Sequence, residues 1–509
     1  MTFPSSYFEV ATRDWQMLFF LLLAVAAILG TAEISRRFVG GSTEFPRKFV
    51  HIALGVPIFL APFLLHRALP AIMASFFFAV FDLAAVKKGW LLAVVGEKNN
   101  YGPVFYPVSF LILAALAWER HPALAVVPMI ILAFADGAAA VAGGFFRRSH
   151  DYVLLQEKKS WEGTATMFVV SLLAVLIGLT VYGSAGKMAL PAFPKLIWIS
   201  LLTALVATAG EAISRNGSDN LTVPLLSGAV LYFLLQSGFP GLRQMTIAVL
   251  ASGVIGWLSY RQQFLTAGGT GVMFIFGVLI FGIGGIVWSI PIVVFFLFSS
   301  LLSKLRENKD SREISAEGKG SRRDEYQVLA NGGVAIFLLL IHLVLRYNML
   351  FILYLSTLAA ATADTWATEI GMWLGKEPRL ITSGKKVARG ISGGVTLAGS
   401  LAAVMGSFLL VLSGVLGQSI TGAKISGKVA ILLALTGFLA SLVDSLLGAT
   451  VQAKFKCELC GALLESPHHC PGGAMVFASG IPWLNNDWVN FLATISAVVI
   501  FPGLLCFLP

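Results

Sequence analysis

Apolar residues in this chain fall into runs of about 20, separated by short polar segments, and the runs recur from Trp15 to Pro509. A helical run of this length spans a bilayer. Because no polar stretch is long enough for a separate soluble domain, the pattern predicts an all-α polytopic membrane protein. We expect sixteen transmembrane helices, near residues 15–34, 49–65, 69–86, 103–118, 122–146, 163–182, 196–213, 222–239, 244–260, 270–288, 290–303, 327–345, 349–373, 391–416, 428–453 and 488–507.

Basic residues set the expected orientation of these helices. Lys and Arg gather in alternate loops, as the positive-inside rule predicts for cytoplasmic loops. Both chain ends then lie outside, and the helices divide into two sets of eight, residues 1–241 and 242–509. An even number of helices per set gives both sets the same orientation, so we expect a parallel repeat. The mixed-charge segment from Lys304 to Arg323 is predicted as a mobile cytosolic loop.

Composition excludes several classes of protein. Hydrophobic residues make up 57% of the 509 residues and charged residues only 12%, which excludes an ordinary soluble protein. The net charge of +10 would suit nucleic-acid binding, but the placement of the basic residues in alternate loops explains it more simply. We therefore expect the lipid bilayer, and no nucleic acid, as a partner. Nothing fixes the oligomeric state, so a homo-oligomer is left open.

One pattern occurs twice, 228 residues apart: Asp-x-x-Ala-x-x-x-Gly in an apolar helix, followed by a lysine-rich loop. The two copies begin at Asp136 and Asp364, and their loops carry Lys158-Lys159 and Lys385-Lys386. Carboxylates inside membrane helices are costly and usually functional. The alternative for each aspartate is that a polar residue is tolerated where small residues let helices pack closely. The alternative for the lysines alone is that their positive charge only sets the orientation of the helices in the membrane. The second copy favours function, since both aspartates fall in the fifth helix of their half.

The correspondence continues two helices later. The matching residues are Glu211 and Asp444 and, in the loops that follow, Asp219-Asn220 and Asn486-Asp487. Phosphoryl transfer uses such a set: carboxylates and Asn to hold Mg²⁺, cations to neutralise phosphate oxygens, and a base near the attacking oxygen. No G-x-x-x-x-G-K-[ST] loop is present, so a P-loop kinase is not expected. The residues thus predict two related sites for Mg²⁺ and a nucleoside triphosphate.

A set of motifs between residues 47 and 239 points to a known family. The motifs are Arg47-Lys48-x-x-His51, Tyr101-Gly-Pro-Val-Phe-Tyr-Pro107, Asp136 to Gly143, Lys159-Ser-Trp-Glu162-Gly-Thr164 and Asp219-Asn-Leu-Thr-Val-Pro224. Together they resemble the CTP-dependent polyprenol kinase group, especially phytol kinase. Dolichol kinase and phosphatidate cytidylyltransferase are more distantly similar.

A second set of motifs lies between residues 262 and 495. It consists of Phe295-Phe-x-x-Ser299-Ser to Ser303-Lys304, Gln327-Val-Leu-Ala-Asn331-Gly-Gly, Ala363-Asp-Thr-Trp-Ala-Thr-Glu369-Ile-Gly, Gly390-Ile-Ser-Gly-Gly394, Asp444-Ser-Leu-Leu-Gly-Ala-Thr450 and Asn486-Asp-x-Val-Asn490. This set resembles the phytyl-phosphate kinase family. The family's usual Gly-Thr is here Gly390-Ile391, which removes a hydroxyl, so we assign no phosphate contact there.

The two resemblances imply a fusion of consecutive kinases. The first half would phosphorylate a long-chain isoprenoid alcohol, such as phytol, geranylgeraniol or farnesol, and the second would convert the isoprenyl phosphate to the diphosphate. The resemblance implies CTP or UTP as the donor of the first step, and both sites would lie on the cytoplasmic face. A rival interpretation is a duplicated transporter, and another is a cytidylyltransferase that makes a CDP-lipid. Loss of activity in one half is a third alternative.

Each candidate residue then has an expected role. In the first half, Asp136, Glu211 and Asp219 are candidates for Mg²⁺ binding and catalysis, Lys158, Lys159, Glu162 and Asn220 for nucleotide binding, and Arg47, Lys48 and His51 for the substrate head group. In the second half, the metal or base candidates are Asp364, Glu369, Asp444 and Asp487, and the phosphate or polar candidates are Lys385, Lys386, Arg389, Asn331 and Asn486.

Four residues have side chains suited to a structural zinc ion: Cys457, Cys460, His468 and Cys470. The Cys-x-x-Cys spacing is typical of a metal site, but the second pair is compressed relative to common zinc fingers. Reduced free thiols are the alternative.

Overall fold

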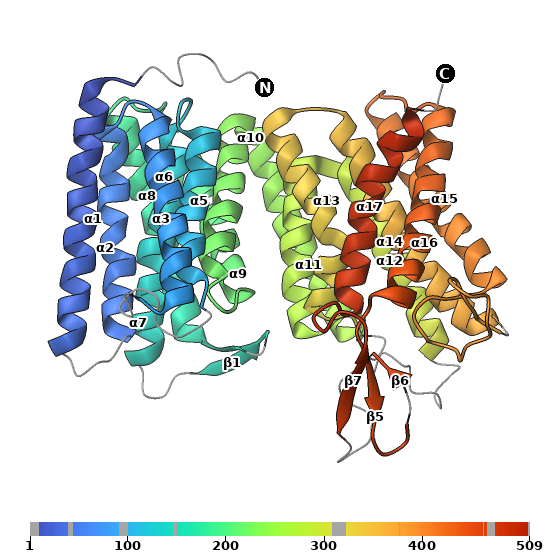
Figure 1. Ribbon diagram of the computed structural model, residues 1–509. Helices are drawn as coiled ribbons and strands as arrows, with labels where there is room; N and C mark the ends of the chain where they lie inside the picture. The colour runs from blue at the N-terminus through green and yellow to red at the C-terminus, as the bar shows by residue number, and fades with distance from the viewer. Residues whose placement is uncertain are drawn as a thin grey trace. The chain divides into compact units, whose positions relative to one another are not determined.

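The computed structural model describes residues 10–38, 44–90, 100–145, 150–155, 157–307, 322–375, 377–461, 463–465 and 474–506. The chain forms two compact units, Met1–Thr246 and Ile247–Pro509, called unit 1 and unit 2 below (Figure 1). The boundary expected between residues 241 and 242 lies a few residues before this division.

Unit 1 is built from helices with one short hairpin. Its elements are α1 (Thr12–Phe38), α2 (Glu44–Leu64), α3 (Ala68–Lys88), α5 (Gly102–Ala117), α6 (Pro122–Ile130), the π-helical turn η2 (Ile131–Asp136), α7 (Gly137–Phe145), β1 (Asp151–Leu154), β2 (Glu157–Ser160), α8 (Trp161–Ser184), α9 (Phe193–Ala212) and α10 (Asp219–Arg261), which continues into unit 2. Strands β1 and β2 pair antiparallel, with Asp151 opposite Ser160.

Unit 2 adds a small sheet to its helices. Its elements are α11 (Ala267–Leu279), η3 (Ile280–Gly284), α12 (Gly285–Glu307), α13 (Glu325–Leu345), α14 (Met349–Leu374), β3 (Arg379–Leu380), β4 (Gly394–Val395), α15 (Leu397–Ile420), α16 (Gly427–Thr450), β5 (Lys454–Cys457), β6 (Leu463–Leu464), β7 (Met475–Ser479) and α17 (Asn486–Leu505). The order of the three-stranded sheet is β6-β5-β7, and it lies beyond the helix ends (Figure 1).

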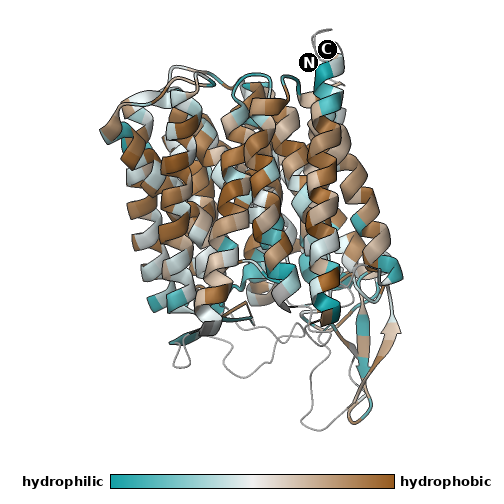
Figure 2. Cartoon of the chain, turned by 90° about the vertical axis from the view of Figure 1, so that its left-hand side faces the viewer, coloured by the Kyte–Doolittle hydropathy of each residue, from teal (hydrophilic) through white to brown (hydrophobic). Residues whose placement is uncertain are grey.

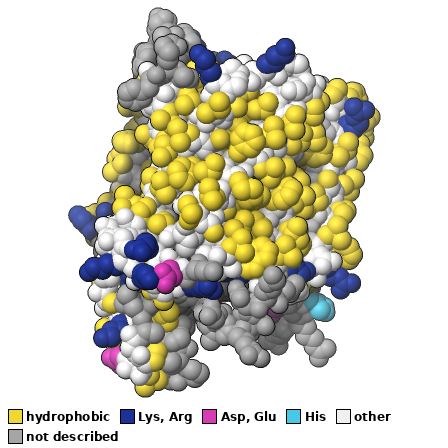
Figure 3. All heavy atoms as spheres, turned by 90° about the vertical axis from the view of Figure 1, so that its right-hand side faces the viewer, with side chains coloured by type: hydrophobic (Ala, Val, Ile, Leu, Met, Phe, Trp, Pro, Cys, Tyr) yellow, Lys and Arg dark blue, Asp and Glu magenta, His cyan; other side chains and the backbone are white. Residues whose placement is uncertain are grey.

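The helices have the length and composition of membrane spans, which confirms the predicted all-α polytopic class. Among the described residues, thirteen helices are long and apolar enough to cross a membrane. Figure 2 shows apolar residues along the helices and hydrophilic residues mainly toward their ends. The face of unit 2 in Figure 3 is a broad apolar band with Lys and Arg at its edges. Such a band is the surface that lipid covers.

Two glycines interrupt long apolar helices. Gly238 in α10 has φ 65° and Gly285 at the start of α12 has φ 72°, a conformation that favours glycine. Divided at these glycines, and with the shorter apolar helix Gly102–Ala117 included, the described helices overlap the sixteen predicted ranges one by one. The number of membrane crossings itself stays a prediction.

Three local expectations differ from the structure. The helix expected at 122–146 contains the π-helical turn η2, and the helix expected from residue 391 begins only at Leu397 because Gly394–Val395 form β4. Of the segment expected as a mobile loop from Lys304 to Arg323, residues 304–307 complete α12. Residues 308–321 lie outside the described part of the chain.

The helices that carry Asp136 and Asp364 are the most enclosed of their units. In the spans Pro122–Gly144 and Met349–Leu374, 72% of the most apolar window is buried, more than in any other span described. Small residues permit this enclosure: a Cβ on Gly137 would lie 2.5 Å from Ile52, and one on Gly437 would lie 2.8 Å from the backbone of Ala359. Each aspartate is therefore held by a tightly packed central helix.

Candidate functional site

Unit 1 contains a cavity of about 320 Å³ that is apolar at one end and polar at the other. Its walls come from α1, α2, α3 and α5, with contributions from the start of α7 and of α10. The apolar part is lined by Leu18, Leu21, Leu22, Val25, Leu29, Val50, Leu54, Pro57, Ile58, Ala61, Leu65, Ala71, Ala74, Phe78 and Phe110. The polar end is lined by Arg47, Lys48, His51, Asp82, Asn100, Asp136, Asp219 and Asn220.

His51 and Asp136 meet at the polar end of the cavity. The His51 Nε2 atom lies 3.4 Å from Asp136 Oδ2 and 3.0 Å from the carbonyl oxygen of Leu132. Leu132 belongs to the π-helical turn η2, a form of local helix distortion that is frequent at functional sites. The distortion therefore lies in the turn that ends at Asp136 and supplies a carbonyl to the imidazole.

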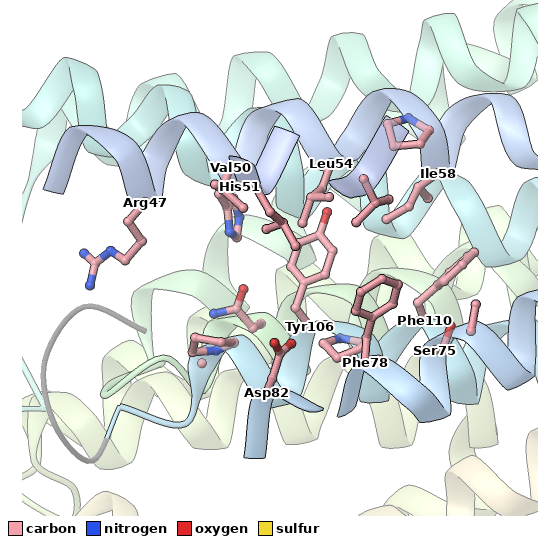
Figure 4. Close-up of a pocket in the computed structure, with 18 of the residues that line it drawn as sticks. Arg47, Val50, His51, Leu54, Ile58, Ser75, Phe78, Asp82, Tyr106 and Phe110 are labelled. Atoms are coloured by element: carbon pink, nitrogen blue, oxygen red, sulfur yellow. The ribbon is translucent and has the colours of Figure 1, made fainter. Parts of the chain in front are cut away.

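The side chains in Figure 4 show which elements supply this end. Arg47 and His51 come from α2, Asp82 from α3 and Tyr106 from α5. The rings of His51 and Tyr106 pack edge to face, with centroids 5.2 Å apart. Among the described residues, the buried Tyr106 hydroxyl has no hydrogen-bond partner, so it is available to a ligand.

Asp219 and Asn220 reach the cavity from the start of α10. The preceding turn is tight: Gly217 has φ 78°, and a Cβ there would lie 2.7 Å from both Asn100 Oδ1 and Gly102 Cα. Asn100 Oδ1 accepts a hydrogen bond of 2.9 Å from the Gly102 amide. Glycines at this crossing thus let two loops approach and place Asp219 near Asp136, where its charge acts on both Asp136 and His51.

The predicted lysines of unit 1 form ion pairs and do not line the cavity. Lys159 Nζ contacts Glu211 Oε1 at 2.5 Å and the Glu211 carbonyl oxygen at 3.0 Å. Burial acts to lower the pKa of Lys159, but the surrounding carboxylates, chiefly Glu211, together raise the pKa above its usual value. Lys158 pairs with Asp151 at 2.5 Å on the hairpin.

Glu162 accepts from the His150 amide at 3.2 Å at the start of α8. None of the described residues Lys158, Lys159, Glu162 and Glu211 lines the cavity. Lys159 nevertheless lies near enough to Asp136 for the two charges to interact. Glu211 is engaged by Lys159, although its charge still acts on Asp136.

Unit 2 contains a second cavity, of about 200 Å³, whose lining is largely polar. Six predicted residues line it: Asn331, Asp364, Glu369, Arg389, Asp444 and Asn486. Further polar residues, for which we expected no role in the site, are Arg306, Arg323, Gln327, Ser441 and Ser445. Three arginines thus face a cavity that also contains three carboxylates.

Asp364 and Asp444 come together from α14 and α16. Their carboxyl groups share a hydrogen bond, although the residues are far apart in the sequence. Carboxylate oxygens that lie close together are the ligands that a divalent cation prefers. The pair is therefore the best candidate in unit 2 for a general base or a divalent-cation ligand.

Glu369 faces a different partner, as its position about 140° around the helix from Asp364 suggests. Its carboxylate lies 2.8 Å from Arg306 Nε and accepts from the Ser303 hydroxyl at 2.6 Å. Arg323 also lies near enough to Glu369 for the charges to interact. Glu369 thus fixes Arg306 beside the cavity.

A glycine-rich loop closes one side of the unit 2 cavity. Gly390 and Gly393 have φ of 79° and 83°, and residues 389–396 line the cavity. The Ser392 amide donates to Glu465 Oε1 at 3.0 Å, and Gln452 Nε2 donates to Glu465 Oε2 at 2.6 Å. Burial raises the pKa of Glu465, whereas these hydrogen bonds act to lower it. Glu465 was not anticipated, because no sequence pattern links it to the loop.

Three predicted residues of unit 2 do not line the cavity. Lys386 pairs at 2.7 Å with Glu377, with both side chains mostly exposed, and Lys385 belongs to the same outer turn. Asp487 lies in the first turn of α17, next to Asn486, which does line it. Arg389 is therefore the predicted cation that reaches the site.

The described residues of neither cavity form a complete metal-binding site on their own. Among the described residues, no group of three or more His, Cys, Asp or Glu side chains is placed to hold a metal ion. Mg²⁺ is often bound by only one or two carboxylates together with substrate phosphates. The carboxylates Asp136 and Asp219, and Asp364 and Asp444, fit that mode.

The zinc prediction falls only partly on described residues. Cys457 is buried at the end of β5, and Cys460 is exposed. His468 and Cys470 lie outside the described part of the chain. The zinc site stays a prediction.

Comparisons with known proteins also identify an integral membrane protein. Residues 250–498 match the family model "Integral membrane protein DUF92". The chain is 32% identical over 288 residues to Protein PGR of Arabidopsis thaliana, covering 51% of this chain and 98% of that protein. It is 30% identical over 265 residues to an uncharacterized membrane protein of Methanocaldococcus jannaschii, covering 52% and 95%.

A further relative carries an enzyme name. The chain is 32% identical over 213 residues to phytol kinase of Synechocystis sp., covering 41% of this chain and 87% of that protein. No solved structure matches. The chain belongs to the phytol kinase family of integral membrane proteins.

Proposed function

We propose that unit 1 is an isoprenoid alcohol kinase. One observation carries the proposal: a single cavity joins an apolar pocket among α1, α2, α3 and α5 to a polar end with His51, Asp136 and Asp219. An isoprenoid alcohol has the same division, with a long apolar tail and one hydroxyl. The relative named phytol kinase, with 87% of its length covered, supports the same chemistry.

The residues of unit 1 then have distinct tasks. With the tail in the apolar pocket, the hydroxyl lies at the level of His51 and Asp136. Asp136 accepts the hydroxyl proton as the oxygen forms its bond to the transferred phosphoryl group, while the bond to the departing nucleoside diphosphate breaks. Arg47 and Lys48 lie at the polar end, where they neutralise phosphate oxygens.

Mg²⁺ would be held by Asp219 together with the nucleotide phosphates, where it would neutralise charge on the phosphates and leave Asp136 to act as the base. Asn220 lines the same end and completes the polar lining. We take CTP or UTP as the donor, on the resemblance to the polyprenol kinases.

Unit 2 would act on the product of unit 1. Its cavity holds Arg306, Arg323 and Arg389, which suit a substrate that already carries a phosphate. The Asp364–Asp444 pair would supply the base for the attacking phosphate oxygen or bind Mg²⁺. Its product would be the isoprenyl diphosphate, with both sites on the cytoplasmic face of the membrane.

The test uses the purified full chain in lipid nanodiscs with Mg²⁺, γ-labelled CTP and geranylgeraniol or geranylgeranyl monophosphate. We expect labelled monophosphate and then diphosphate from the alcohol, and diphosphate from the monophosphate, with CDP as the other product. Release of pyrophosphate and formation of a CDP-lipid would instead establish a cytidylyltransferase. Absence of any labelled lipid would contradict the proposal.

A further inference from the structure

The apolar pocket of unit 1 has a similar depth on three of its helices. Along α2 and the residue that follows it, the lining runs from His51 at the polar end to Leu65, and on α3 it runs back from Asp82 to Ala71. At about 1.5 Å per helical residue, these separations correspond to roughly 21 Å and 17 Å. The lining from α1, Leu18 to Leu29, again gives roughly 17 Å.

The far end of the pocket is closed by small and apolar side chains. Ala61, Leu65 and Ala71 are each less than 5% exposed. On α5 the lining stops at Phe110, whose ring lies 6.3 Å from that of the buried Trp118. The tail of a ligand meets packed protein at this end.

Two buried or half-buried carboxylates fix the turn behind this closed end. Asp14 of α1 is fully buried and accepts hydrogen bonds from the His66 and Arg67 amides at 3.1 and 3.0 Å. Glu119 accepts from the Ala68 amide at 2.8 Å and from the Arg67 guanidinium at 3.2 Å. Because charge-assisted bonds hold the turn between α2 and α3, the end wall cannot retreat easily.

Carbon chains can be compared with this depth. C–C bonds of about 1.5 Å at tetrahedral angles advance an extended chain by roughly 1.25 Å per bond. A tail of four isoprene units is then roughly 19 Å long, one of three units roughly 14 Å, and one of eight units roughly 39 Å. The four-unit tail fills the pocket from the hydroxyl level to the end wall.

We infer that this pocket measures the isoprenoid tail, and that the end wall formed by Ala61, Leu65 and Ala71 limits the substrate to about four isoprene units. The inference deepens the proposed function and rests on it. The limit comes from steric exclusion, since a tail that leaves the bilayer for an apolar pocket gains little hydrophobic energy. Long polyprenols then bind less well, because their tails meet packed residues at the end wall.

The test reads the position of the tail directly. Alcohols of two, three and four isoprene units with a diazirine at the tail end are photolysed with the full chain in nanodiscs, and labelled peptides are mapped. The four-unit probe is expected to label the end wall, and the two-unit probe to label the region of Leu54 and Ile58. An unlabelled eight-unit alcohol is expected to compete with the four-unit probe roughly tenfold or more weakly than the four-unit alcohol does.

A substitution about two thirds of the way along the pocket sharpens the test. Ala74 lines the pocket eight residues from Asp82, so Ala74→Phe should leave a pocket of roughly 12 Å. We expect it to lose end-wall labelling by the four-unit probe and to keep labelling by the two-unit probe. Met73→Phe is the matched control, since Met73 is 50% exposed and does not line the cavity.

The outcomes separate this inference from the proposed function. Equal competition by the eight-unit alcohol, labelling that does not move with tail length, or no labelling by any probe would overturn the inference. Phosphorylation is measured in parallel on the same samples. Correct labelling without phosphorylation would contradict only the proposed kinase activity. Phosphorylation without length-dependent labelling would contradict only the inference that the pocket limits the length of the tail.

Discussion

The cavities of units 1 and 2 contain a membrane aspartate from the same short pattern, yet their surroundings differ. Asp136 lies beside one histidine at the mouth of a deep apolar pocket, whereas Asp364 lies beside Asp444 in a largely polar cavity with three arginines. The first arrangement suits an uncharged head group on a sequestered tail. The second suits an anionic head group. The comparison teaches that neighbouring residues can give one short sequence pattern two different chemical surroundings.

The largest expected effect comes from the paired carboxylates of unit 2. Asp364→Asn keeps the shape but removes a base and a charge, so we expect conversion of monophosphate to diphosphate to fall by roughly 10²–10⁴-fold. Phosphorylation of the alcohol should stay within about twofold, because Asp364 is not in unit 1. Assays with each lipid substrate measure both values. A normal rate of diphosphate formation would remove Asp364 from the chemistry.

The buried ion pair between Lys159 and Glu211 should stabilise the fold of unit 1. Lys159→Met leaves Glu211 buried without its partner, and we expect a loss of about 3 kcal/mol in the free energy of unfolding. The double variant Lys159→Met with Glu211→Met should recover much of that loss. Denaturant titration of the three proteins checks this. If the single variant is as stable as wild type, the ion pair does not hold the hairpin to α9.

The same pair predicts a pH dependence with a definite sign. Because the pKa of Lys159 is raised in the folded protein, the contribution of this ion pair to the free energy of unfolding is fully present below the usual lysine pKa near 10.4. Stability should therefore be lost only as the pH rises through the raised pKa. The difference in stability between wild type and the double variant, measured from pH 7 to 11, should shrink at the alkaline end. A difference that is lost near neutral pH would contradict the raised pKa.

The smallest effect expected distinguishes two glycines of one loop in unit 2. A Cβ on Gly393 would lie 2.4 Å from the Ala449 Cβ, whereas one on Gly384 would meet open space, and both have positive φ. Gly393→Ala should displace the cavity loop and lower diphosphate formation by roughly 10–100-fold. Gly384→Ala should cost only about 1 kcal/mol in stability and leave the rate unchanged. Equal rates for the two variants would show that the loop does not shape the site.

The sequence predicted the class of fold and the convergence of several site residues. Arg47, His51, Asp136 and Asp219 were expected together and line one cavity, since motif residues on buried helices have few alternative positions. The sequence did not predict Arg306 as a site residue, because the mixed charges around it resemble those of a loop. In the structure α12 continues through Arg306, which pairs with Glu369.

The lysine loops show which contacts the sequence could not predict. Lys159 follows the pattern of a phosphate ligand, but its ammonium is used by Glu211, a residue 52 positions away. The apolar pocket was also invisible in the sequence, because leucines and alanines that line a cavity have the same pattern as those that face lipid. Pairing and cavities depend on tertiary contacts, which no local pattern encodes.

The central claim is that two separate sites act in succession on one lipid. It is tested most directly by Asp136→Asn in the full chain, given γ-labelled CTP with either geranylgeraniol or its monophosphate. We predict that the variant makes almost no monophosphate from the alcohol but converts the monophosphate to diphosphate at the wild-type rate. Loss of both conversions, or of neither, would contradict the account.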